Sequence, residues 1–266
     1  MAEFLLELYS EEIPPQLQIN ARNDLKKNIE KTIQDEDLKY KALEVYSSPT
    51  RLTLLIQGLS EKVKILPKEI KGPKVGVPEN ILQGFIKSQN INKEDVFEKE
   101  IEKGKFYFVK TEAKEILTRD LLTKIIPKSL NEISWKKSMK WSDDSLIWGR
   151  PLRSIFAVFN NKILKFNYGH LESTDDIFIE TDLIFKTKKI KTFKEYQSFL
   201  KINKIILDQN ERKKKILKRF EVICKAKKFE ENFNSHLLEE VTNIVENPNV
   251  LLVDFKKAYL KIPKEI

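Results

Sequence analysis

Two β-hairpin signals constrain the fold of this chain more than any other feature. Asn160 and Asn161 tolerate the positive φ angles that a two-residue hairpin turn requires. Pro49 presets its φ angle and cannot donate to a strand ladder, so it also favours a turn. Each turn is flanked by strand-like runs: residues 154–159 and 163–166 around the two asparagines, and residues 42–47 and 51–59 around Pro49. We therefore expect antiparallel hairpins.

Helix signals lie between the predicted strands. After a strand at residues 3–9, Pro14 and Pro15 open a helix, because the missing N–H of proline costs nothing in the first turn. Residues 116–133 predict another helix, which Pro127 should kink or divide. The apolar face of the first helix recurs every four residues and consists of Leu17, Ala21, Leu25, Ile29 and Ile33.

The region between these helices carries weaker signals. Gly72-Pro73 should break the chain. A short helix is expected at residues 81–86, and a hairpin turn is expected around Lys103-Gly104. The second strand of that hairpin should contain Phe106, Phe108 and Val109.

Beyond residue 190 the chain becomes helical and basic. Asp208 and Glu211 form a capping-box pair for a helix with a basic surface. Residues 236–246 predict a further helix, and Val250 to Val253 predict a strand. The fold class is therefore α+β: antiparallel hairpins with packed helices, followed by a more helical, basic carboxy-terminal part. We place the domain division between residues 1–185 and 186–266.

The positive charge is concentrated in one segment. The whole chain has 49 basic and 40 acidic residues, a formal charge of +9. Residues 186–228 hold 16 of the basic and 4 of the acidic residues, a local balance of +12, which leaves 33 basic and 36 acidic residues elsewhere. Codon bias toward Lys would spread more evenly, so the segment favours a surface that faces a polyanion. A merely solvated Lys face is the alternative.

Several function classes are excluded by what the chain lacks. A single cysteine, Cys224, allows no internal disulfide and fits a reducing cytosol, so we expect a cytoplasmic protein. The acid-flanked start is unlike a secretory signal, and no apolar run is long enough to span a membrane. The two histidines, His170 and His236, have no second ligand type at metal spacing. No Gly-rich phosphate loop or nucleophile–base spacing occurs, so we assign no catalytic or metal-binding residue.

Three arginines stand out in a chain that otherwise uses lysine. Only seven basic residues are Arg, and a planar guanidinium can make the bidentate phosphate contacts that Lys cannot. Arg51, Arg150 and Arg153 are therefore candidates for RNA contact. Each could equally hold a buried loop through its donors, and both interpretations stay open.

Six further residues complete the candidate RNA-binding set. Lys137 and Lys140 lie among three tryptophans, at positions 135, 141 and 148, which could act as stacking platforms for bases or as core residues. The other four lie largely off the apolar face of the helix that follows Asp208: Lys213, Lys214, Lys218 and Arg219.

Short motifs also occur in a fixed order from one end of the chain to the other. They lie at residues 7–15, 48–52, 137–141, 150–153, 237–248 and 262–266. Together they resemble the amino-terminal part of the β subunit of bacterial two-subunit glycyl-tRNA synthetase. The chain departs from the usual family residues at several places: Tyr9-Ser10 replaces Gly-Thr, Thr50 replaces Arg, Asn247 replaces Trp, and Leu171-Glu172 replaces Arg-Phe.

The resemblance implies a division of labour. A separate α subunit would carry the catalytic core and use glycine and ATP with Mg, in an α2β2 assembly. This chain would bind tRNA(Gly) and the α subunit, hold no cofactor, and make no glycyl-adenylate alone. Members of the family continue into an HD-like and an anticodon-binding domain, so we expect this chain to be an amino-terminal part or one half of a split subunit.

Two other functions are weighed against this one. The chain could be a free-standing RNA-binding or assembly module without a synthetase partner. It could also be a nucleotidyltransferase acting on tRNA ends, but that chemistry needs clustered carboxylates after a Gly-rich strand–helix turn. Asp143-Asp144 and Asp175-Asp176 lack that setting.

Overall fold

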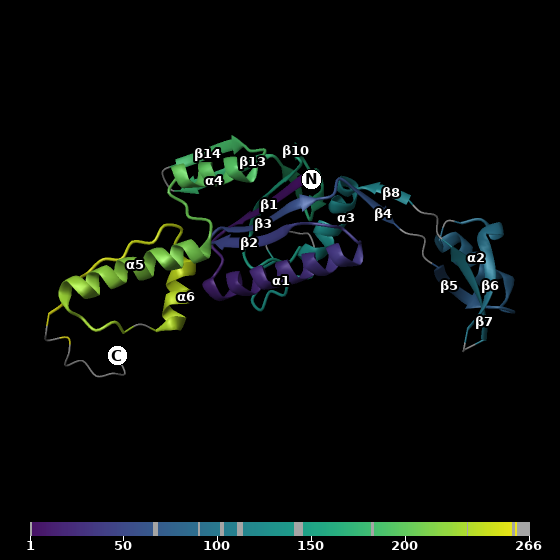
Figure 1. Ribbon diagram of the computed structural model, residues 1–266, viewed down its shortest axis with the longest axis horizontal. Coiled ribbons are helices and arrows are strands. Elements are labelled where there is room, and N and C mark those ends of the chain that lie inside the picture. Colours follow the sequence, from purple (N-terminus) through teal and green to yellow (C-terminus); the bar gives the residue numbers. More distant parts are fainter. Residues whose placement is uncertain are drawn as a thin grey trace.

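The computed structural model describes residues 2–65, 69–89, 91–101, 104–110, 114–140, 146–181, 184–232, 234–256 and 259. These residues form a mixture of helices and mainly antiparallel strands, which confirms the predicted α+β class (Figure 1). The predicted motif at residues 262–266 and Trp141 lie outside the described residues.

A seven-stranded sheet forms the centre of the molecule. Its strands are β1 (Ala2–Ser10), β2 (Ala42–Ser48), β3 (Arg51–Leu59), β9 (Leu152–Phe159), β10 (Lys162–Ile163), β11 (Asn167–Tyr168) and β12 (Leu171–Thr174). They are ordered β11-β12-β9-β1-β3-β2, with β10 beside β9. β12 runs parallel to β9, and the other pairings are antiparallel.

The hairpins predicted at Pro49 and at Asn160-Asn161 are confirmed. β2 pairs with β3 across the turn at Pro49, and β9 pairs with β10 across Asn160 and Asn161. The two asparagines have φ angles of 49° and 61°, the left-handed conformation that Asn tolerates better than most residues.

Two helices cover one face of the sheet. The helix α1 (Pro15–Asp35) buries all five of the predicted apolar residues, and it packs beside α3 (Thr118–Asn131). Phe4, Leu6 and Leu8 of β1 point into the same core. Pro127 lies inside α3 without dividing it, while residues 116 and 117 belong to the strand β8 (Lys114–Leu117) rather than to the helix.

The other face of the sheet is covered by elements from the basic segment and the residues just before it. The hairpin of β13 (Asp176–Thr181) and β14 (Ile184–Lys189), which the sequence did not predict, packs there with α4 (Phe193–Ile202). The strand β1 is therefore buried on both faces. The predicted domain division at residue 186 falls inside β14.

A small module projects from one end of the molecule (Figure 1). It consists of β5 (Glu69–Lys74), β6 (Val96–Ile101), β7 (Gly104–Lys110), α2 (Glu79–Gln89) and the short 3₁₀ helix η1 (Lys93–Asp95). The paired strands β4 (Lys62–Ile65) and β8 precede and follow it in the chain. The predicted break at Gly72-Pro73 is wrong, because β5 continues through it with a shift in its register to β7.

Two helices lie at the end opposite the module (Figure 1). They are α5 (Gln209–Lys227), whose predicted cap Asp208 accepts the N–H of Asn210, and α6 (Ser235–Ile244). The strand predicted at Val250 to Val253 is wrong. Those residues form no regular structure, and Leu251 and Val253 are exposed.

Candidate nucleic-acid interface

Three of the ordered sequence motifs meet in space around Arg51. The guanidinium of this residue is 2% exposed, and its Nε lies 3.1 Å from the Glu7 carboxylate. Its Nη1 lies 2.9 Å from the carboxylate of Glu246, and Nη2 donates to the Phe178 carbonyl at 2.6 Å. The motifs at residues 7–15, 48–52 and 237–248 therefore form one buried ion-paired centre.

Neighbouring hydroxyl groups extend this centre. The Thr50 hydroxyl accepts a hydrogen bond from Arg51 at 2.8 Å and donates to Glu246 at 3.0 Å. The phenol of Tyr196 donates to Glu7. These contacts join β1, β3, α4 and the segment after α6 in a single hydrogen-bonded network.

Burial and charge determine how these groups ionise. Burial raises the pKa of the Glu7 carboxyl, and the guanidinium of Arg51 acts against that rise. Burial alone would lower the pKa of Arg51, but the carboxylates of Glu7 and Glu246 outweigh it, so the pKa is raised. Burial, followed by the charge of Glu7, raises the pKa of Tyr196 well above its usual value. Arg51 therefore keeps its charge, and Tyr196 keeps its donor proton.

A second buried guanidinium, that of Arg212, fastens the carboxy-terminal helices to the sheet. Its side chain is fully buried, and its nitrogens donate at 2.8–2.9 Å to the backbone carbonyls of Ser47, Ile206, Leu207 and Thr242. Burial lowers its pKa to about 10, so the group remains charged at neutral pH. It satisfies carbonyls from β2, the α4–α5 connection and α6 at once.

The amides of Gln18 and Asn243 add further hydrogen bonds between the carboxy-terminal helices and the sheet. Gln18 donates to the carbonyls of Ile13 and Asn243, both at 2.7 Å, and accepts from the Ser47 hydroxyl at 3.1 Å. Arg22 donates to the amide oxygen of Asn243 at 3.1 Å. Because buried polar groups must find partners, this network fixes α1, β2 and α6 relative to one another.

Arg51 is therefore not a candidate for RNA contact. The sequence left a structural and an RNA-binding interpretation open, and burial with two carboxylate partners decides for the structural one. A polyanion could reach this guanidinium only by breaking a buried ion pair, which is costly.

The other predicted arginines are more accessible. Arg153 is exposed and lies 2.7 Å from the carboxylate of Glu180, while half-buried Arg150 donates to the Gly149 carbonyl at 2.9 Å. Lys137 and Lys140 are both exposed. The indoles of Trp135 and Trp148 pack together at 4.7 Å in the core, so these two tryptophans are structural.

The predicted residues of α5 separate into two kinds. Lys214, Lys218 and Arg219 are exposed on the outer surface of the helix. Lys213 is half-buried and pairs with the carboxylate of Glu239 on α6. It therefore joins the two helices, and the other three remain accessible to a polyanion.

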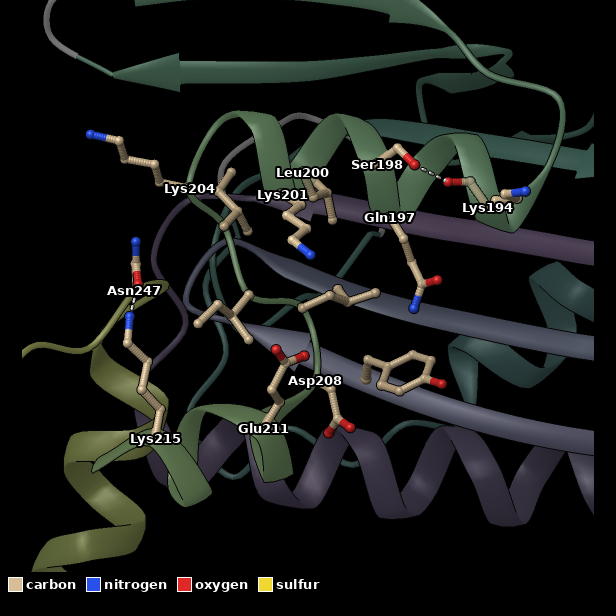
Figure 2. A pocket seen from close by; sticks show the side chains of 14 residues that line it. Lys194, Gln197, Ser198, Leu200, Lys201, Lys204, Asp208, Glu211, Lys215 and Asn247 are labelled. Carbon is tan, nitrogen blue, oxygen red and sulfur yellow. Dashed lines mark hydrogen bonds between the residues drawn. The ribbon is translucent and has the colours of Figure 1, made fainter. Parts of the chain in front are cut away.

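A cleft of about 660 Å³ opens between α4 and α5. In Figure 2, Gln197 and Lys201 point from α4 toward α5. Lys215 of α5 hydrogen-bonds to Asn247, in the segment after α6. Asp208 and Glu211 contribute carboxylates to the same cleft, whose other lysines are Lys194 and Lys204. The cleft continues the basic surface of α5 across to α4.

Lys194, Lys201 and Lys204 were not among the predicted site residues. Their signal was present in the charge run at residues 186–228, but only the pairing of α4 with α5 in space shows that they share a cleft with α5. The roles of Glu7, Tyr196 and Arg212 had no comparable signal, since a hydrogen bond between residues 189 apart, such as that from Tyr196 to Glu7, leaves no local pattern.

The described residues contain no group of three or more His, Cys, Asp or Glu side chains that could hold a metal ion. Among the helices formed by those residues, none is long and apolar enough to cross a membrane.

Comparison with known proteins agrees with the motif order. Residues 4–266 match the family model described as the glycyl-tRNA synthetase beta subunit. Glycine–tRNA ligase beta subunits from Rickettsia felis and Clostridioides difficile are both 33% identical, over 100% and 98% of this chain. The corresponding protein from Rickettsia typhi is 34% identical over 100% of the chain. The chain spans about 40% of the length of these curated relatives.

Proposed function

The chain belongs to the glycyl-tRNA synthetase β-subunit family, and from that membership we propose that it binds tRNA(Gly) through the basic surface of α4 and α5. Exposed Lys214, Lys218 and Arg219 on α5 would contact backbone phosphates, and the lysines of the cleft would extend that contact to α4. Phosphate contacts of this kind position a protein on RNA without reading sequence.

The support for this proposal is the exposure of basic side chains on a rigidly held helix. Arg212 buries its guanidinium among carbonyls of three elements, so α5 is fixed beside the sheet. Three of its cations nevertheless remain exposed. A positively charged surface that is held in place loses little conformational entropy when it meets a polyanion.

Further parts of the proposal concern the whole assembly. The chain would work with a catalytic α subunit in an α2β2 assembly in the cytoplasm, attaching glycine to tRNA. ATP with Mg and glycine would be used by the α subunit, and this chain would hold neither. Arg150, Arg153, Lys137 and Lys140 would be secondary tRNA contacts.

The experiment is a titration of tRNA(Gly) with the complex of this chain and its α subunit at several salt concentrations. Replacing Lys214, Lys218 and Arg219 by Gln should weaken binding. It should also reduce the slope of log affinity against log salt by roughly 2–3 units, since each phosphate contact contributes about 0.7–0.9. The effect should be similar for other tRNAs, because phosphate contacts carry no sequence information.

The matched control removes three positive charges elsewhere. Lys27, Lys31 and Lys39 are exposed near α1, and replacing them by Gln should leave the salt slope unchanged. An unchanged slope in the α5 variant, or an equal reduction in the control, would contradict the proposed surface and favour a solvated Lys face.

A further inference from the structure

The outlying module has a sheet with one face covered by its helix. The helix α2 covers the face that carries Ile70 and Val109, which are paired across β5 and β7. Val109 is 1% exposed, and a Cβ added to Gly72 would meet the Phe85 ring of α2 at 2.7 Å. Because side chains alternate along a strand, the residues next to Ile70 and Val109 point to the opposite face.

That opposite face alternates aromatic rings with ammonium groups. Residues paired across an antiparallel ladder point to the same side, so the register places there the pair of Glu69 and Lys110 and, next to it, two rows of three side chains. Read from β5 through β7 to β6, the rows are Lys71, Phe108 and Phe97, followed by Lys74, Phe106 and Lys99.

The contacts on this face confirm the arrangement. The rings of Phe97 and Phe108 stack with their centroids 6.2 Å apart. The ammonium group of Lys71 lies 3.6 Å from the centroid of the Phe106 ring, and that of Lys99 lies 5.6 Å from the Phe108 ring. Three rings and three cations therefore pack together on this face, where Phe108 is 7% exposed and Phe97 is 37% exposed.

Two features of this surface are available to a ligand. The Phe97 ring is 37% exposed, although an apolar ring gains nothing from contact with water. Lys71 and Lys74 are exposed on β5, across β7 from this ring, while Lys99 of β6 pairs across the same strand with Glu69 of β5. An accessible aromatic ring flanked by lysines combines a stacking surface with groups that attract phosphate.

We propose that this open sheet face binds unpaired RNA nucleotides. A base stacks on the Phe97 ring, and the phosphates beside it contact Lys71 and Lys74. The surface complements RNA because every base has a π-face and every nucleotide carries a negative charge. An apolar protein partner would instead have to desolvate three ammonium groups, which is unfavourable.

This inference depends on the proposed function only in taking RNA as the ligand, because its surface is different from that of α4 and α5. It adds recognition of unpaired nucleotides to the phosphate contacts of the basic segment. A base inside a duplex is already stacked on its neighbours, so a ring on this face discriminates between unpaired and paired RNA.

The test measures binding of the whole chain to two labelled RNAs. One is an unpaired oligouridylate of about eight nucleotides, within the usual site size for such surfaces, and the other is a blunt RNA duplex of the same length. Phe97→Leu should weaken oligouridylate binding at least about fivefold, because stacking on an aromatic ring is lost. Binding of the duplex should not change. Lys71→Gln should weaken oligouridylate binding and reduce its salt dependence.

Matched controls lie on the helix side of the module. Ile81, 49% exposed, and Lys87, also exposed, both belong to α2, so Ile81→Ala and Lys87→Gln should leave both affinities unchanged. Urea unfolding of each variant verifies that the module remains folded. Since Phe97 is exposed, its replacement should not shift the unfolding midpoint.

The outcomes are distinct. Unchanged oligouridylate binding by Phe97→Leu overturns the proposal, as does an equal loss for the duplex. Weakened association with the α subunit at constant RNA affinity overturns it in favour of a protein interface. If the α5 variant leaves tRNA binding intact while Phe97→Leu still selectively weakens oligouridylate binding, the proposed function of α5 fails and this inference stands.

Discussion

The guanidinium of Arg51 and the carboxylate of Glu7 lie 3.1 Å apart on adjacent strands, and both side chains are almost completely buried. Two residues of separate sequence motifs thus form an ion pair inside the molecule. Removing Arg51 would leave the Glu7 carboxylate without its counter-ion in a medium of low dielectric constant.

Replacing Arg51 by Met should therefore destabilise the chain by about 3–5 kcal/mol. The double variant Arg51→Met with Glu7→Leu should recover part of that loss, because no fully buried charge is left without a partner and the Glu246 carboxylate is 27% exposed. Urea unfolding of the two single variants and the double variant gives the coupling energy. Additive effects of the two substitutions would show that the pair does not stabilise the fold as a unit.

The substitution Arg212→Met should loosen the carboxy-terminal helices more than the sheet. It removes the donors for four backbone carbonyls, each of which costs about 1–3 kcal/mol when it is buried without a partner. Amide hydrogen exchange should accelerate in α5 and α6 before it does in β1 and β3. Lys218→Met, on the exposed side of the same helix, is the control and should leave exchange unchanged.

Asn161 should tolerate glycine but not valine. Its φ angle is 61°, which glycine adopts freely and which costs a β-branched residue about 1–2 kcal/mol. Thermal unfolding should show Asn161→Gly near the parent and Asn161→Val clearly less stable. Equal midpoints for the two variants would contradict the left-handed turn.

The chain without an α subunit should not support glycine-dependent exchange of pyrophosphate into ATP. The expectation follows from the proposed division of labour and from the sequence, which contains no Gly-rich phosphate-binding motif. Addition of the α subunit to the same preparation is the positive control. Sustained exchange by the purified chain alone would contradict the assignment of catalysis to the partner.

The exposed apolar side chains of α6 should make the chain bind apolar dyes. Leu237, Val241 and Ile244 are 56%, 38% and 51% exposed and recur at helical spacing, so they form one apolar stripe. Such a stripe favours association. Val241→Ser should reduce both dye fluorescence and the concentration-dependent increase in sedimentation coefficient, whereas Val222→Ser on α5 should have a smaller effect.

Local signals predicted local structure well in this chain. The four-residue spacing from Leu17 to Ile33 identified the buried face of α1, and Asn160-Asn161 identified a hairpin, because both depend on residues that are close in sequence. The hairpin of β13 and β14 escaped prediction. Its second strand includes Lys186, Lys188 and Lys189, so the basic character of the segment obscured the strand.

The candidate site was only partly predictable for a related reason. The charge run at residues 186–228 identified the basic surface, since net charge is a property of composition. Whether a particular arginine is buried depends on distant partners. Arg51 meets Glu246 across 195 residues of chain, and Arg212 meets Ser47 across 165, so neither pattern of spacing nor residue type distinguished them from exposed arginines.

The distance between Arg51 and Glu246 along the chain also sets an order for folding during synthesis. Ribosomes add roughly 5–20 residues per second, so the strand carrying Arg51 waits about 10–40 s for the carboxylate of Glu246 to be made. Glu7 is already present during that interval and supplies the first counter-ion. The buried centre can therefore be completed only after α6 and the segment that follows it have been made, which makes the docking of that segment the step that completes the ion-paired centre.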